Sequence, residues 1–542
     1  MRVLKSSVQR IGSDLEKVRS TLALTAALPG FFRKQITLRD AEAQIARLLD
    51  ARVGTFLDLV RTEVFESPSS PYRALFAHAG CTLADLEAHV RRNGVEPTLE
   101  RLAGEGVYLT SDEFSGRTPV VRGSMALQVS PGTFERRGPT PGYALESSGS
   151  RGTPSRSFSP LDWRGLQAAG EAVFFASHDL YTCVHALYEP LVTGRISTLL
   201  INSKLNVPTD RWFAIQVSAH GPAELRYHRV NARIVATLGQ WFGPGVANPE
   251  LVDRADLAPI ERWMAENRRR GRRCALRTVV SNATRIARAA RAAGTSLEGV
   301  TFWVSGEPLT PTRKQLIEDA GARIALQYGP GGGIAAALGC GNPEIIDDMH
   351  LPLMLWTAVA HPTPLDLSGP PVHPLLFTTL HPFAPRVLVN VGNGDHATIT
   401  ARSCGCPLER VGFTRHVHTV RSFEKLTGEG MNYFGATLPD VLERVLPAEF
   451  GGGPGDYQLV EEEDERGQAR VTLLVDPGVG PLDEGRVLMR LQEGLAAGSR
   501  NNRFMTAIWQ DTGAFGLRRE PPRASARGKV LALRVDRPFS SA

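Results

Sequence analysis

The stretch that decides the fold reads Trp303-Val304-Ser305-Gly306-Glu307-Pro308-Leu309-Thr310. Apolar residues up to Val304 predict a strand, Gly306 predicts a turn, and residues 311–320 have the pattern of a helix. Short apolar strands alternate with helical patterns from about residue 160 to 400, which predicts an α/β domain with a central sheet. The other clear strands are expected at residues 196–201, 324–326 and 387–391.

The chain divides into three parts by pattern and composition. Residues 1–130 form a helical N-terminal segment with apolar residues at helical spacing. Residues 131–420 form the α/β domain, which begins in a region rich in Gly, Pro and Ser. Residues 421–542 form a small α+β domain, with strands expected at 471–475 and 487–491 beside two short helices.

A Gly/Ser-rich loop lies at the start of the large domain. The loop follows the apolar stretch Tyr143-Ala144-Leu145 and can therefore form a flexible turn at a strand end. Backbone N–H groups and hydroxyls in such a turn can converge on phosphate oxygens. The alternative is a solvated Ser/Gly linker. The loop reads Glu146-Ser147-Ser148-Gly149-Ser150-Arg151-Gly152-Thr153-Pro154-Ser155.

Two further strand-end segments contain glycine and polar residues. The first segment contains Tyr328 and Gly329 and continues to Gly333, and the second is Val391-Gly392-Asn393-Gly394-Asp395. An acidic residue at a strand end, such as Asp395, can accept hydrogen bonds from both ribose hydroxyls. Each segment alone is a weak signal, because glycine turns between strands and helices also occur for structural reasons.

Four cysteine and histidine positions have metal-ligand character. Cys404 and Cys406 form a tight pair around Gly405. Cys340 and His350 follow the glycine-rich segment that ends at Gly333. Three thiolates and one imidazole make a closed tetrahedral site, which is the structural type of zinc site. Four unrelated residues remain the alternative. A disulfide framework is not expected, since the six cysteines are spread over a chain of 542 residues.

The net charge of +6 and the pI near 9.1 raise the question of nucleic-acid binding. The arginine run 268–273 follows an amphipathic helix, and arginines in a last helical turn usually face solvent. We therefore expect no nucleic-acid partner, although binding through this run stays an alternative. The apolar stretch 22–32 is interrupted by Thr25, Pro29 and Gly30 and suits neither a signal peptide nor a membrane span. We expect a cytoplasmic protein without a membrane partner.

Taken in order, these segments resemble the adenylate-forming (AMP-binding) superfamily, and most closely its phenylacetate–CoA ligase branch. The segment from Arg421 to Asn432 resembles the hinge of that family, and Arg527-Gly528-Lys529-Val530 resembles the turn with its catalytic lysine. The resemblance covers residues 70–542, with its motifs in the expected order. Members of the branch also have a similar Cys…His…Cys-x-Cys arrangement, which favours structural Zn²⁺ here.

The resemblance implies a ligase that uses ATP and Mg²⁺ to convert an organic carboxylate into acyl-AMP and then passes the acyl group to a thiol. The implied acceptor is CoA, with a carrier-protein thiol or an amine as alternatives. The small C-terminal domain would rotate between the two half-reactions. Lys529 and Arg421 would be catalytic. The implied ATP-binding residues are Ser147, Ser148, Gly149, Ser150, Arg151, Gly152, Gly306, Glu307, Tyr328, Gly329, Asp395 and Arg421.

Departures from the family pattern leave a second hypothesis open. Thr153 stands where the family has a loop lysine, and Arg151 can supply the missing cation. Gly332 stands where the family has a magnesium-binding glutamate. The alternative is therefore a catalytically degenerate protein of the same fold that still binds a nucleotide. The identity of the carboxylate and the oligomeric state are not predicted.

Overall fold

A computed structural model describes residues 21–536 with several gaps. The residues outside the description within this range are 117, 137–140, 147–155, 192–195, 216–221, 254–255, 307–308, 310, 330–335, 362–372, 423–437, 464–468, 498–514, 525–529 and 531.

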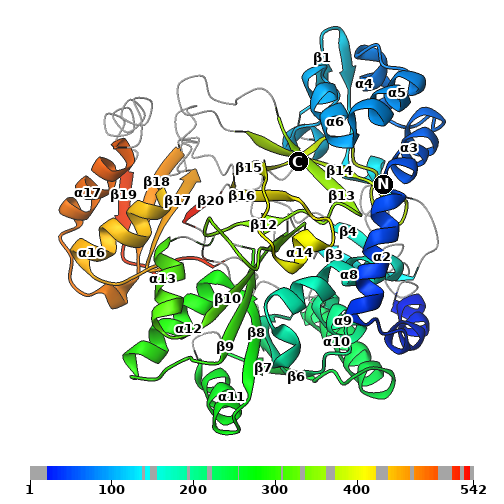
Figure 1. The fold of residues 1–542 in the computed structure, drawn as a ribbon. Coiled ribbons are helices and arrows are strands. Elements are labelled where there is room, and N and C mark those ends of the chain that lie inside the picture. The colour runs from blue at the N-terminus through cyan, green and yellow to red at the C-terminus, as the bar shows by residue number, and fades with distance from the viewer. Residues whose placement is uncertain are drawn as a thin grey trace, which may run out of the picture.

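A mixed sheet of twelve strands forms the centre of the molecule (Figure 1). Its strand order is β13-β14-β15-β16-β12-β11-β10-β9-β8-β5-β6-β7. From β10 to β7 all neighbours are parallel, and from β13 to β10 all neighbours are antiparallel. The strands are β5(Cys183–Pro190), β6(Thr209–Ile215), β7(Pro249–Val252), β8(Arg273–Val279), β9(Val300–Ser305), β10(Arg323–Tyr328), β11(Ala337–Gly339), β12(Met349–His350), β13(Trp356–Ala360), β14(Pro374–Thr379), β15(Val391–Ala401) and β16(Arg415–Ser422).

Helices connect the parallel strands, because parallel neighbours need a crossover. Buried residues of these helices and of the sheet form the largest core cluster, which includes Phe174, Ile286 and Phe302. The central parallel strand β9 is buried along nearly its whole length, as expected for a strand covered on both faces. The helices are α8(Leu161–Ser177), η3(Leu180–Thr182), α9(Ile196–Lys204), α10(Pro222–Phe242), α11(Ala258–Arg269), α12(Val280–Ala292), α13(Pro311–Asp319) and α14(Pro407–Arg410).

The helices of residues 52–104 pack against the antiparallel half of the sheet, whereas residues 38–50 pack against α8 (Figure 1, blue). Leu24 and Leu28, in the helix of residues 21–33, share a buried cluster with Leu199 of α9. Residues 21–33 are helical, and capping boxes at Thr37, Thr82 and Thr110 begin α2, α5 and α7. The elements are α2(Leu38–Asp50), α3(Arg52–Val60), η1(Arg61–Phe65), α4(Tyr72–His78), α5(Leu83–Asn93), α6(Val95–Gly104), α7(Ser111–Phe114), β1(Val120–Arg122), β2(Met125–Leu127) and η2(Pro131–Phe134).

Two strands flank the Gly/Ser loop. They are β3(Gly142–Glu146) and β4(Arg156–Pro160), which pair antiparallel from Gly142 opposite Pro160 to Glu146 opposite Arg156. The predicted strand before the loop is therefore present, while the loop itself lies outside the described residues.

The C-terminal part forms a separate four-stranded sheet of order β19-β18-β17-β20 (Figure 1, orange and red). Leu459, Leu473 and Leu491 belong to its own buried cluster, which joins the sheet to its helices. The elements are α15(Leu438–Asp440), η6(Val441–Val445), α16(Leu446–Phe450), β17(Tyr457–Glu463), β18(Ala469–Val475), η7(Pro477–Val479), α17(Glu484–Ala496), β19(Phe515–Arg518) and β20(Leu533–Asp536).

The α/β fold class is confirmed, but three predicted strands are wrong. Residues 196–201 lie in α9, which is buried along its whole length and so has no polar face to reveal its helical period. Residues 487–491 lie in α17, where Val487, Leu491 and Leu495 share one buried face. The strand expected at 387–391 begins only at Val391, because the preceding Asn390 has a left-handed backbone (φ 50°).

Among the described residues, no helix is both long and apolar enough to cross a membrane.

Candidate functional site

Three polar side chains meet where β10 ends and β15 begins. The Tyr328 hydroxyl donates to Asp395 Oδ2 at 2.6 Å, and Asn393 Nδ2 lies 2.7 Å from the same oxygen. Asn393 Nδ2 also contacts the Tyr328 hydroxyl at 2.7 Å. The Asp395 backbone N–H donates to Asn393 Oδ1 at 3.1 Å, so the Asn-Gly-Asp turn is closed on itself. This arrangement fixes the orientation of the Asp395 carboxylate.

The carboxylate of Asp395 is half-buried and keeps acceptor capacity. Both described donors bind Oδ2, and Oδ1 accepts no hydrogen bond from the described residues. A carboxylate held in this way can accept hydrogen bonds from neutral hydroxyl groups, such as those of a ribose. The sequence identified Tyr328 and Asp395 but assigned no role to Asn393. Asn393 could have been found from its position two residues before Asp395, because an Asn side chain at such a position commonly closes a turn.

Gly306 lies near this group because β9 and β10 are parallel neighbours. Gln327 pairs with Ser305, so Gly306 and Tyr328 follow at the same edge of the sheet. Gly306 has a φ of 87°, which favours glycine at the turn. Gly329 follows Tyr328 directly, just after the end of β10.

The remaining predicted nucleotide-binding residues are not brought into this group by the described structure. The backbone of Arg421 pairs with His396 in the β15–β16 ladder, and nothing further is described for this residue. The others lie outside the described residues; they are Ser147, Ser148, Gly149, Ser150, Arg151, Gly152, Glu307 and Lys529. Thr153 and Gly332 also lie outside them.

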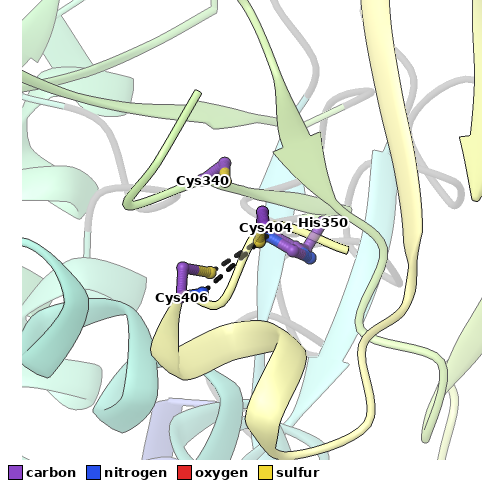
Figure 2. A group of neighbouring side chains, drawn as sticks. All are labelled: Cys340, His350, Cys404 and Cys406. Atoms are coloured by element: carbon purple, nitrogen blue, oxygen red, sulfur yellow. Dashed lines mark hydrogen bonds between the residues drawn. The ribbon is translucent and has the colours of Figure 1, made fainter. Parts of the chain in front are cut away.

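The four predicted metal ligands do converge (Figure 2). Cys340 follows β11, His350 lies on β12, and Cys404 and Cys406 precede α14. One ligand atom from each residue lies within 4.8 Å of all the others. His350 Nε2 is 3.2 Å from Cys406 Sγ and 3.6 Å from Cys404 Sγ. Zinc bond lengths place neighbouring ligand atoms about 3.5 to 3.8 Å apart in a tetrahedron, so this donor set fits a zinc ion.

The surroundings of the cluster orient its ligands. His350 Nδ1 is 2.6 Å from the carbonyl oxygen of Phe413, so Nδ1 carries the proton and Nε2 presents a lone pair to the sulfurs. Glu409, on α14, accepts hydrogen bonds from Ser403 Oγ at 2.6 Å and from the Cys404 backbone at 2.7 Å. These bonds, together with one from the Gly405 backbone, lower the pKa of Glu409 to about 2.

The thiols of Cys340 and Cys406 differ in pKa. The interaction between Cys340 and Cys406 raises the pKa of Cys340 and lowers the pKa of Cys406. Cys406 is therefore the thiolate that is available first, and metal binding would release the remaining thiol protons.

Three residues beside the cluster were missed by the sequence reasoning. Asp348 Oδ1 lies 2.7 Å from His416 Nδ1, and Arg402 donates a short hydrogen bond to Asp348 Oδ2. Burial alone would raise the pKa of Asp348, but the bonds from His416 and Arg402 lower it to about 2. The position of His416 opposite His350 in the β12–β16 ladder gave no signal in the linear sequence.

Structural comparison identifies the fold. A crystal structure of 2-hydroxyisobutyryl-CoA ligase in the postadenylation state, with R3-HIB-AMP, matches 90% of this chain and 89% of its own chain. The TM-score is 0.50 at 15% sequence identity. The chain has the adenylate-forming ligase fold.

Other solved structures with this fold match less closely. The same ligase with 2-HIB-AMP and CoA in the thioesterification state gives a TM-score of 0.43 at 15% identity, over 90% of this chain and 89% of that chain. O-succinylbenzoate coenzyme A synthetase from Bacillus subtilis gives 0.43 at 10% identity, over 72% of this chain and 68% of that chain. No protein-family model and no curated protein matches the sequence.

Proposed function

We propose that the chain is an acid–thiol ligase of the adenylate-forming superfamily, most similar to its phenylacetate–CoA ligase branch. In the first step the oxygen of an organic carboxylate attacks the α-phosphorus of Mg²⁺-bound ATP, which gives acyl-AMP and releases pyrophosphate. In the second step a thiol, CoA in this proposal, attacks the acyl carbon and releases AMP. The observation that carries the proposal is the Tyr328–Asn393–Asp395 group at the sheet edge of an adenylate-forming ligase fold.

The proposed roles follow from the chemistry of each side chain. Asp395 would accept the ribose hydroxyls, with Asn393 and Tyr328 holding its carboxylate. The Ser/Gly loop would bind phosphate oxygens, with Arg151 as its cation. Lys529 and Arg421 would stabilise negative charge that develops during adenylation. The proposed domain boundaries remain 1–130, 131–420 and 421–542.

Pyrophosphate release tests the first step. The full chain would be incubated with ATP and Mg²⁺ across aryl, fatty and amino carboxylates, and AMP binding would be followed by thermal shift in the same samples. Release that depends on one carboxylate would support the ligase and identify its substrate class. AMP binding without release from any carboxylate would instead support the degenerate nucleotide-binding protein. Loss of release in Lys529→Ala with AMP binding retained would support the role of the lysine.

We also propose that Cys340, His350, Cys404 and Cys406 bind one structural zinc ion. The convergence of four ligand atoms and the Nδ1 hydrogen bond of His350 support this proposal. Zinc bound there would join three segments that lie far apart in the sequence. Elemental analysis of the purified chain should find one zinc per chain, and Cys404→Ser should release it and lower the melting temperature. A folded, zinc-free chain with unchanged stability would contradict the assignment.

A further inference from the structure

A second group of potential metal ligands overlaps the proposed zinc site. Cys340, Asp348 and His416 are all buried, and one ligand atom from each lies within 4.8 Å of the other two. Cys340 belongs to both groups, so its sulfur is placed to bridge two cations. Thiolate, carboxylate and imidazole together make a donor set suited to a divalent transition metal.

The guanidinium of Arg402 lies against this second group. Its Nη2 is 3.6 Å from Cys340 Sγ and forms the short hydrogen bond to Asp348 Oδ2. The same Nη2 donates to the backbone oxygen of Asn342 at 3.1 Å, and Nη1 donates to Glu344 Oε1 at 3.2 Å. A positive charge therefore contacts both anionic members of the group, where a second metal ion would also have to bind.

His416 adds an imidazole that the described structure leaves partly unused. Its side chain is fully buried, and its ring centroid lies 4.0 Å from that of His350. Nδ1 is bound to Asp348, whereas Nε2 has no hydrogen-bond partner among the described residues. An ion shared with Asp348 would bind Nδ1 in place of the proton that now lies between the two side chains, because Nε2 points to the other side of the ring.

We propose that Cys340, Asp348 and His416 form a second cation subsite, that Arg402 fills it with its guanidinium, and that this keeps the metal centre mononuclear. Charge supports the proposal. A zinc ion with three thiolates and a neutral imidazole carries one net negative charge, and Asp348 adds another. Arg402 offsets part of this charge without needing a metal. A divalent ion placed beside the guanidinium would be repelled by it. Removing the guanidinium would leave the three ligands available to a second ion.

Zinc stoichiometry of the full chain tests this inference directly. Each variant would be equilibrated with excess zinc chloride, passed through gel filtration and measured for zinc per chain by elemental analysis. The parent chain and Arg402→Lys, which keeps a cation, should hold one zinc. Arg402→Ala should hold two. Arg402→Ala combined with His416→Ala should return to one, because the second subsite loses a ligand.

Controls separate this inference from the proposals on which it rests. Circular dichroism would show that each variant is folded, and Arg402→Gln, which keeps an amide donor, provides a second neutral variant. One zinc or none in both folded neutral variants would overturn the inference, as would two in the parent chain. A parent chain without zinc would instead refute the metal centre itself. Ligase activity does not enter the readout, so the outcome is independent of the proposed reaction.

Discussion

The Asp395 carboxylate is held by two donors on one oxygen, and this geometry leads to a prediction about nucleotide binding. Asp395→Ala should weaken AMP binding by about 10- to 100-fold, because a hydrogen bond to a charged group contributes roughly 1.5 to 3 kcal/mol. Asn393→Ala should weaken AMP binding less, since it removes only a hydrogen bond that orients the Asp395 carboxylate. Isothermal titration calorimetry would measure both affinities.

The control for this prediction is a ligand without ribose hydroxyls. The affinity of 2′,3′-dideoxy-AMP should be nearly the same for the parent chain, Asp395→Ala and Asn393→Ala. An equal loss for AMP and for the dideoxy ligand would mean that Asp395 does not bind the ribose.

The raised pKa of Glu171 leads to a prediction about how the stability of the chain depends on pH. Burial raises its pKa to about 7 against the opposing hydrogen bond from Gln327, whose Nε2 lies 2.6 Å from Glu171 Oε2. Between its ordinary pKa and about 7 the unfolded chain is ionised while the folded chain keeps the proton. The free energy of unfolding should therefore fall as pH rises through this range, by up to about 3 kcal/mol.

Glu171→Gln should remove this dependence because the amide does not titrate. The melting temperature of the variant should exceed that of the parent chain at pH 8, and the two should be nearly equal at pH 5. Differential scanning calorimetry at the two pH values would test it. A constant difference between variant and parent at both pH values would show that Glu171 does not titrate in this range.

At the scale of elements, the turn before α14 sets the positions of Cys404 and Cys406, which must both face the proposed zinc ion. Gly405 has a φ of 70°, and a Cβ added there would meet nothing within 4 Å, so only the backbone conformation disfavours other residues. Gly405→Ala should cost about 1 kcal/mol of stability and should speed zinc release to a chromogenic chelator.

Gly271 offers a matched control for this turn. It has a φ of 67° and is equally open, but it lies in the turn after α11. Gly271→Ala should cost a similar free energy of unfolding and leave the rate of zinc release unchanged. Faster release in both variants would mean that the effect comes from general destabilisation.

The turn after α11 also bears on the arginine run. α11 ends at Arg269, and its last-turn arginines are exposed. Arg270 pairs with Glu266 at 2.6 Å, and Arg268 donates to the Ser296 carbonyl oxygen. These contacts support the interpretation of the run as a solvated helix end.

At the scale of the whole molecule, ion pairs connect the C-terminal part to helices of the large domain. Arg313 on α13 lies 2.9 Å from Glu443 on η6, and each side chain is only 5% exposed. Arg288 on α12 lies 3.0 Å from Asp456, in a more exposed position. Any rotation of the C-terminal part must break these pairs, so they favour the orientation seen here.

Glu443→Ala should lower the melting temperature markedly, because removing one partner of a buried pair costs roughly 3 to 5 kcal/mol. The double variant Arg313→Met/Glu443→Leu should recover much of the loss, since it leaves no unpaired buried charge. The exposed pair Arg291–Asp319 is the control, and Asp319→Ala should change stability by less than about 1 kcal/mol. Equal losses in the buried and exposed variants would argue against a role for the buried pair.

Local sequence was sufficient for much of this molecule. Strands β9, β10 and β18 and helices α5, α11 and α13 could be predicted because their apolar periods and end signals lie within a few residues. The proposed metal ligands were chosen for their thiol and imidazole side chains, and Asp395 for an acidic side chain at a strand end; both assignments stay predictions.

Other features were decided by the tertiary structure alone. Helix α9 was mistaken for a strand because burial on all sides removes the polar face that marks a helix. Arg402, Asp348 and His416 could not be selected from the sequence, since their roles depend on partners far away along the chain. The sequence by itself determined which chemical groups the chain carries and which segments with a clear apolar period form strands or helices. Only the tertiary structure decided which groups meet, because strand order in the sheet sets distances between residues that are far apart along the chain.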